Sequence, residues 1–148
     1  MLRLGALLAM GACMMWAQDH QDHVMGFSHE KTTHHFELHK DGGSIEVRAD
    51  DSKDTESRDQ IRSHFQHIRQ MFINGDFNVP MLVHERDVPG TASMSRLKGD
   101  LHYELQQTDQ GARIVITADT RAARDAVHEF LRFQIADHKT GDCTSVRW

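Results

Sequence analysis

A β-β-α pattern occurs twice along the chain, and this repeat restricts the fold more than any other sequence feature. The matching segments are His35-Phe36-Glu37-Leu38 with His102-Tyr103-Glu104-Leu105, Ser44 to Asp50 with Arg113 to Asp119, and Arg58-Asp59, Ile61 and Phe65 with Arg124-Asp125, Val127 and Leu131. One such unit cannot bury its own apolar face, so the two must pack together. The repeat predicts an α+β fold: duplicated β-β-α units forming a four-stranded, mostly antiparallel sheet with two helices on one face, and an approximate two-fold axis between the halves, 32–75 and 98–140.

Local signals place the elements of the first half. Apolar and polar residues alternate on both sides of Asp41-Gly42-Gly43, which predicts a β-hairpin over 32–50. A helix is expected to follow, with Ser57 and Gln60 as a capping box, an apolar period that holds to Phe72 and a stop at Gly75.

The second half gives the same sequence of signals. Residues 76–95 contain Pro80 and Pro89, which predicts a long, partly extended connection. A second hairpin is expected around a turn near 109–111, and a last helix over about 120–138, with Gly141 just beyond its end.

The two ends of the chain lie outside this pattern. Residues 1–17 have the layout of a secretory signal peptide, which predicts a periplasmic or secreted protein. The alternative is lipidation at Cys13, which would tether the protein to a membrane. Residues 18–31 are His-rich and unpatterned, which predicts a flexible lead-in; the single α+β domain is expected over 32–140, with 141–148 as a C-terminal tail.

Composition and motifs exclude several classes of function. The net charge is -5, which gives no electrostatic footprint for nucleic acid. The sequence contains no Gly-rich phosphate loop, no Gly-x-Ser-x-Gly elbow and no His-Glu-x-x-His helix. A binding protein is therefore expected rather than an enzyme.

Histidine and methionine gather in and after the first predicted helix, which predicts a metal site. The candidate ligands are His64, His67, Met71, Met81, His84 and Met94. Imidazole and thioether together suit Cu(I), so copper is the expected metal. In the repeat, His64 and His67 correspond to Phe130 and Phe133. Because a buried imidazole needs partners for its nitrogens, this exchange favours a bound ligand. The alternative is that both histidines lie at the rim of the core and bond to backbone or water.

Three other sites stay open from the sequence. The outward faces of two strands carry His35, Glu37, His39, His102 and Glu104, which suit zinc or a dimer interface. The alternative function is therefore a non-catalytic structural or protein-interaction module that dimerises through this face. Cleavage after Ala17 would expose Gln18-Asp19-His20, a Cu(II) or Ni(II) chelate. A His and Met pair could also hold haem.

The sequence resembles a group of small secreted bacterial proteins with no established function. The resemblance rests on the following residues: His34-His35-Phe36, Ile61-Arg62 with His64 and His67, Gly75-Asp76-Phe77, Pro80-Met81 with His84, Phe130 to Ile135, and Thr140-Gly141-Asp142. The resemblance implies an exported protein and no particular activity.

Overall fold

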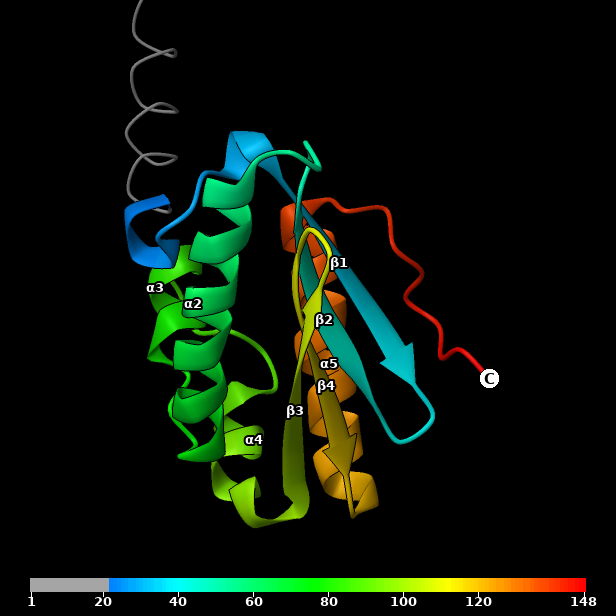
Figure 1. The fold of residues 1–148 in the computed structure, drawn as a ribbon. Helices are drawn as coiled ribbons and strands as arrows, with labels where there is room; N and C mark the ends of the chain where they lie inside the picture. Colours follow the sequence, from blue (N-terminus) through cyan, green and yellow to red (C-terminus); the bar gives the residue numbers. More distant parts are fainter. Residues whose placement is uncertain (1–21) are drawn as a thin grey trace, which may run out of the picture.

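The computed structural model describes residues 22–148 and consists of one sheet covered by helices (Figure 1). The elements in chain order are η1 (His29–Lys31), β1 (Thr32–His39), β2 (Gly42–Ala49), α2 (Thr55–Ile73), α3 (Asn78–His84), α4 (Thr91–Arg96), η2 (Lys98–Asp100), β3 (Leu101–Thr108), β4 (Gly111–Ala118) and α5 (Arg121–His138). The strands form an antiparallel sheet in the order β1-β2-β4-β3. The predicted α+β fold is confirmed.

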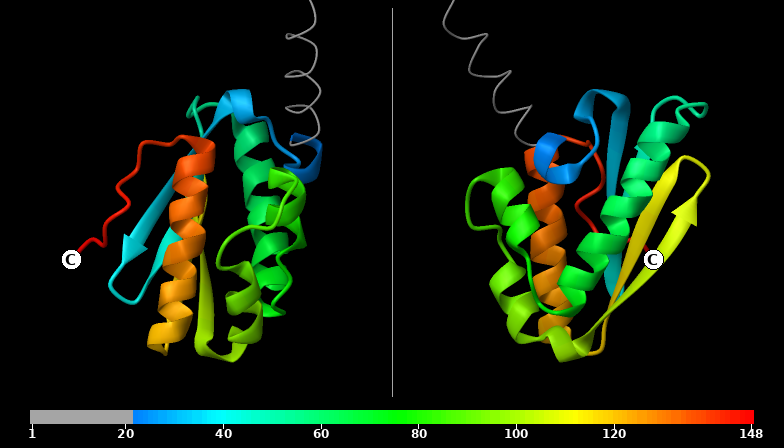
Figure 2. Two further views of the ribbon diagram at one scale, coloured as in Figure 1. Left: turned by 180° about the vertical axis from the view of Figure 1, so that it is seen from behind. Right: turned by 60° about the vertical axis from the view of Figure 1, so that its left-hand side comes forward.

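Each long helix covers the hairpin of the other half. The two helices lie side by side on the same face of the sheet (Figure 2), where α2 packs chiefly on β3 and β4, and α5 chiefly on β1 and β2. The core between them contains Phe65 of α2 and Leu131 of α5, at most 1% exposed. This exchange of helices is how two units that cannot bury their own apolar faces form one core.

The strand register shows the two-fold relation directly. At the centre of the sheet Ile45 pairs with Ile114, the matching residue of the other half. Gly42 pairs with Thr117 and Arg48 pairs with Gly111, and each of these pairs becomes the other when the halves are exchanged. The approximate axis therefore passes between the two isoleucines.

The register also corrects the sequence match of the first strands by two residues. Phe36 pairs with Ile45, and Leu105 pairs with Ile114, so Phe36 corresponds to Leu105 and not to Tyr103. Tyr103 corresponds instead to His34. The sequence match was misleading because a shift of two residues keeps every side chain on the same face of a strand.

Equivalent hydrogen bonds join each helix to the turn of the opposite hairpin. On α2, Arg62 donates to the carbonyl oxygens of Thr108 (2.6 Å) and Gly111 (3.1 Å). On α5, the Nε2 of His128, the residue that corresponds to Arg62, lies 2.9 Å from the carbonyl oxygens of His39 and Gly42. Both side chains thus provide hydrogen-bond donors to backbone carbonyl groups at the ends of strands.

Two local predictions are wrong. Helix α2 begins at Thr55, and the Asp54 carboxylate accepts from the backbone N–H of Ser57, so Asp54 replaces the expected capping box of Ser57 and Gln60. Residues 76–95 are not mainly extended, because they form α3 and α4. Pro80 is the third residue of α3, where a backbone N–H has no helical acceptor and proline is tolerated.

Gly75 ends α2 as predicted. It has a φ of +76°, its N–H donates to the Phe72 carbonyl, and the N–H of Asp76 donates to the Met71 carbonyl, the pair of bonds of a Schellman motif.

Residues 22–31 pack on the domain and are not a free lead-in. Met25 is 6% exposed and Phe27 is 3% exposed, and both lie in the core. These two apolar side chains suffice to anchor a segment that has no periodic pattern. The predicted signal peptide, Cys13 and the Gln18-Asp19-His20 triplet lie outside the described residues, and no helix in the described part of the chain has the length and hydrophobicity to span a bilayer.

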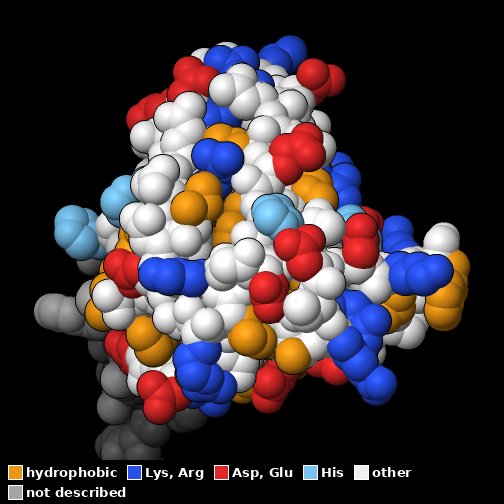
Figure 3. Space-filling model, turned by 90° about the horizontal axis from the view of Figure 1, so that it is seen from below, with side chains coloured by type: hydrophobic (Ala, Val, Ile, Leu, Met, Phe, Trp, Pro, Cys, Tyr) orange, Lys and Arg blue, Asp and Glu red, His pale blue; other side chains and the backbone are white. Residues whose placement is uncertain are grey.

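The C-terminal tail follows the outer edge of β1 (Figure 1). Asp142 accepts from the backbone N–H of Phe36, and the N–H of Arg147 donates to the Leu38 carbonyl. This edge of the sheet is thereby covered. In the end view of Figure 3, acidic and basic side chains are interspersed and hydrophobic side chains form small, separate groups.

The helix cap gives a first prediction. Replacing Asp54→Ala should lower the free energy of unfolding by about 1 kcal/mol, because the N–H of Ser57 loses its acceptor. Gln60→Ala, at an exposed site, should change it by less than about 0.5 kcal/mol. Urea denaturation followed by circular dichroism measures both. An equal loss of unfolding free energy in both variants would mean that Ser57 and Gln60 form the cap, as the sequence predicts.

Candidate metal centre

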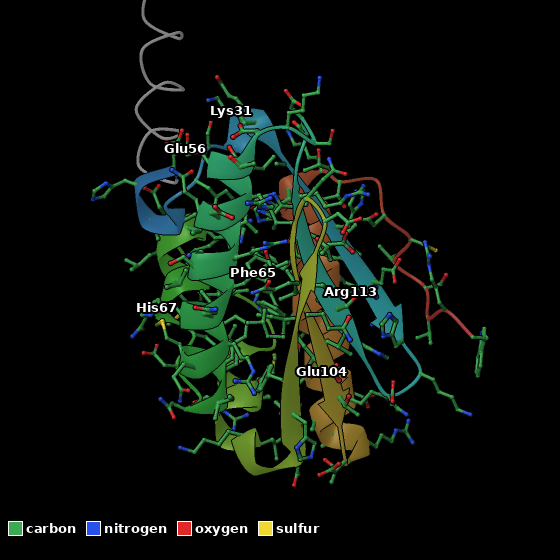
Figure 4. The ribbon with its side chains drawn as sticks, in the orientation of Figure 1. Lys31, Glu56, Phe65, His67, Glu104 and Arg113 are labelled. Carbon is green, nitrogen blue, oxygen red and sulfur yellow. The ribbon has the colours of Figure 1, made fainter. Side chains whose placement is uncertain are left out.

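The six residues predicted from the sequence to bind metal lie in different surroundings. His64 and His84 line one cavity, whereas Met81 lines a separate hollow beside α3 and α4. Met94 is 0% exposed and belongs to the core. Met71 is half-buried, and His67 is exposed and points away from the sheet, opposite to Phe65 (Figure 4).

The cavity has a volume of about 70 Å³ and lies at the end of the core that the N-terminal segment covers. Four histidines contribute to its wall: His34, His64, His84 and His138. Hydrocarbon side chains form most of the remaining surface, and Met25 adds a thioether. Imidazoles and one sulfur therefore surround an otherwise apolar space.

Three imidazoles converge at one side of this cavity. His29 on η1, His34 on β1 and His138 at the end of α5 each present a nitrogen, and these three atoms lie within 4.8 Å of one another. The His34 and His138 ring centroids are 4.9 Å apart, with 19° between the ring planes. Within residues 22–148, this is the group of histidine, cysteine or carboxylate side chains whose spacing suits a metal ion.

The sequence placed His34 and His138 in no site, although both could have been found. Strand alternation puts His34 on the inward face with Phe36 and Leu38. His138 follows Leu131 and Ile135 along the buried face of α5. His29 lies outside any periodic pattern, so only the fold brings it near the other two.

Hydrogen bonds leave nitrogen atoms free in this group. His29 Nδ1 lies 2.9 Å from the Asp22 carboxylate, which leaves Nε2 of that ring available. Among the described residues, neither ring nitrogen of His34 or His138 has a hydrogen-bond partner. No nitrogen of either ring is both fully buried and unpartnered, so these nitrogens face accessible space and remain available to a ligand.

The neighbouring His84 differs because both of its ring nitrogens are engaged. Nδ1 lies 2.6 Å from the Asp137 carboxylate, and Nε2 lies 3.0 Å from the Gln134 side-chain oxygen. Its ring packs edge-on against His138, with centroids 5.1 Å apart. His84 therefore supports the His138 ring rather than offering a free nitrogen.

Burial favours the neutral form of three histidines, His34, His64 and His138. Burial, and then repulsion from the charge of His138, lowers the pKa of His34 from 6.5 to about 3. Burial also lowers the pKa of His64 to about 4, with a smaller contribution from His67. The pKa of His138 falls to about 4 through burial and then through the charge of His84. Neutral imidazole is the form that binds metal.

The repeat gives each of these three histidines an aromatic counterpart. His34 corresponds to Tyr103 by strand register, and the helix match that pairs His64 with Phe130 also pairs His138 with Phe72. The counterparts pack together, since the Phe72 ring centroid is 5.8 Å from Tyr103 and 6.3 Å from Phe130. The equivalent positions of the other end thus hold two hydrocarbon rings and one phenol, whose hydroxyl is buried without a hydrogen-bond partner, and no imidazole.

The outward histidines of the sheet form no common site. Two strands separate β1 from β3, which places His35, Glu37 and His39 roughly 14 Å from His102 and Glu104. His35 is also engaged, because it contacts Asp142 at 3.2 Å and Arg48 at 2.7 Å. Zinc held between the two strands within one chain is excluded by this order, whereas dimerisation through the face stays a prediction.

Comparison of the chain with protein-family models, with curated proteins and with solved structures found no match.

The three lowered pKa values predict acid sensitivity. As the pH falls from about 6.5 towards 4, these histidines take up protons in the unfolded chain before they do so in the folded one. Stability is therefore full above pH 6.5 and falls below it, by roughly 1.4 kcal/mol per pH unit for each histidine.

Urea denaturation from pH 7.5 to 4.5 measures this dependence. The triple variant His34→Phe, His64→Phe, His138→Phe should flatten the curve over the same range. An equal slope in the variant would mean that the acid sensitivity comes from other groups.

Proposed function

We propose that this protein binds a transition metal of the copper type through His29, His34 and His138. The observation that supports this most is the convergence of three imidazole nitrogens within 4.8 Å, two of the rings having no hydrogen-bond partner in the described part of the chain. Imidazole suits copper, zinc, iron and nickel, and the Met25 thioether in the adjoining wall favours Cu(I) among them. The proposed ligands differ from the set expected from the sequence, although the expected metal is the same.

Binding requires a small contraction of the site. Nitrogen ligands lie about 2.0–2.1 Å from a bound zinc ion, which brings two nitrogens to roughly 3.3 Å from one another in a tetrahedral site, and copper needs a similar approach. His34 and His138 belong to the rigid sheet and the long helix, whereas His29 lies on a three-residue segment outside the sheet. We expect His29 to make most of the movement.

Charge and export bear on the same proposal. Because His34 and His138 stay neutral well below pH 6, protons compete weakly with the metal at these two rings. The expected periplasmic or secreted location is an oxidising setting, which is compatible with a copper protein.

Removal of two ligands tests the proposal. The His34→Phe, His138→Phe variant should lose stoichiometric Cu(I), with an affinity reduced by at least about 100-fold, since one ring alone remains. Competition with a Cu(I) chelator, together with metal analysis of the untagged protein, measures this.

The matched control is His64→Phe, His67→Phe. It removes two histidines of α2 and none of the proposed ligands. It should retain one copper per chain. Loss of copper from the control and not from the first variant would instead assign the site to His64 and His67, two of the ligands expected from the sequence.

The carboxylate behind His29 gives a finer prediction. Asp22→Asn keeps a hydrogen bond to Nδ1 but removes the negative charge that strengthens it and helps to fix the orientation of the ring. Affinity for Cu(I) should fall about 10- to 100-fold while the stoichiometry stays at one. An unchanged Cu(I) affinity in Asp22→Asn would contradict the assignment of His29 as a ligand.

A further inference from the structure

The cavity lies directly beside the proposed ligands, and this position bears on what the metal does. His34 and His138 belong both to the converging group and to the cavity wall, whereas His29 does not line the cavity. Three protein ligands leave a fourth position of a tetrahedral ion unfilled, the arrangement of reactive metal sites rather than of structural ones. The unfilled position would face the cavity, on the side away from His29.

The volume and the wall of the cavity limit what can bind there. At about 70 Å³ it exceeds the roughly 10–15 Å³ that one water needs and is about half the roughly 150 Å³ of a cavity that holds a benzene ring, so it admits a molecule of a few heavy atoms. Its walls are mainly hydrocarbon, including Phe36, Ile45 and Val47, and such walls penalise a charged ligand through lost hydration. A two-atom, uncharged molecule fits both limits.

His64 is a polar group in the wall that remains for such a molecule, whereas the side-chain oxygen of Gln134 is engaged by His84. His64 lines the cavity, has no hydrogen-bond partner among residues 22–148, and lies outside the converging group. As a neutral imidazole it carries one N–H, which can donate to a ligand bound at the metal. Its counterpart in the other half, Phe130, carries no such donor.

We propose that the copper site holds a small uncharged diatomic molecule, of the class of dioxygen, nitric oxide and carbon monoxide, in this cavity, with the His64 N–H donating to it. The inference rests on the proposed function, because the diatomic molecule would occupy the open position of the bound copper.

Carbon monoxide on the Cu(I)-loaded protein is the probe, followed by infrared spectroscopy. The wild type should give a single narrow C–O stretching band. His64→Phe should keep one copper per chain and move the band to higher frequency, because the donor that polarises the bound molecule is lost.

A second pair of variants tests the place of binding. Val79 lies on α3 at the cavity wall, and Val79→Phe should fill the space. Leu82→Phe, at an exposed position of the same helix, is the matched control. Val79→Phe should keep its copper and lose most of the band, whereas Leu82→Phe should match the wild type. If Val79→Phe does not fold, the band shift in His64→Phe still decides.

The possible failures are distinguishable. Stoichiometric copper without a carbonyl band, or a band unchanged in both His64→Phe and Val79→Phe, would overturn this inference and leave the proposed function in place. Absence of copper binding in the wild type would overturn both.

Discussion

The exchange of helices between the two halves is the constraint on which the rest of the structure depends. Each hairpin buries its apolar face under the helix of the other half, and Arg62 and His128 fix each helix to the opposite turn. The core therefore has two ends related by an approximate two-fold axis. Equivalent positions at these ends lie on equivalent strands and helices, so their residue types can be compared directly, although different segments cover the two ends.

At one end the equivalent positions hold Phe72, Tyr103 and Phe130, which pack ring against ring. At the other end they are histidines, and this end alone is closed by the N-terminal segment that brings His29 and Met25. An imidazole in such a wall is partly desolvated, a cost that phenylalanine does not have. Metal binding would recover that cost, since a neutral imidazole nitrogen becomes a ligand.

Much of the fold could be predicted from the sequence, because both hairpins, both long helices and the repeat leave periodic signals. The failures were local. Asp54 outcompeted Ser57 as the cap because its carboxylate accepts directly from the helix N–H, and α3 formed despite Pro80 because proline is tolerated in a first turn. The site was located only in part. His64 lies in the cavity, but His34 and His138 converge across more than a hundred residues, which no local spacing reveals.

The central claim is that the buried imidazoles are retained for a metal and not for the fold. Denaturation of the wild type and of the His34→Phe, His138→Phe variant, each with and without Cu(I), tests it most directly. The account predicts that the metal-free variant is the more stable by at least about 1 kcal/mol and that copper stabilises the wild type alone. A metal-free variant less stable than the wild type, with copper stabilising neither protein, would contradict it.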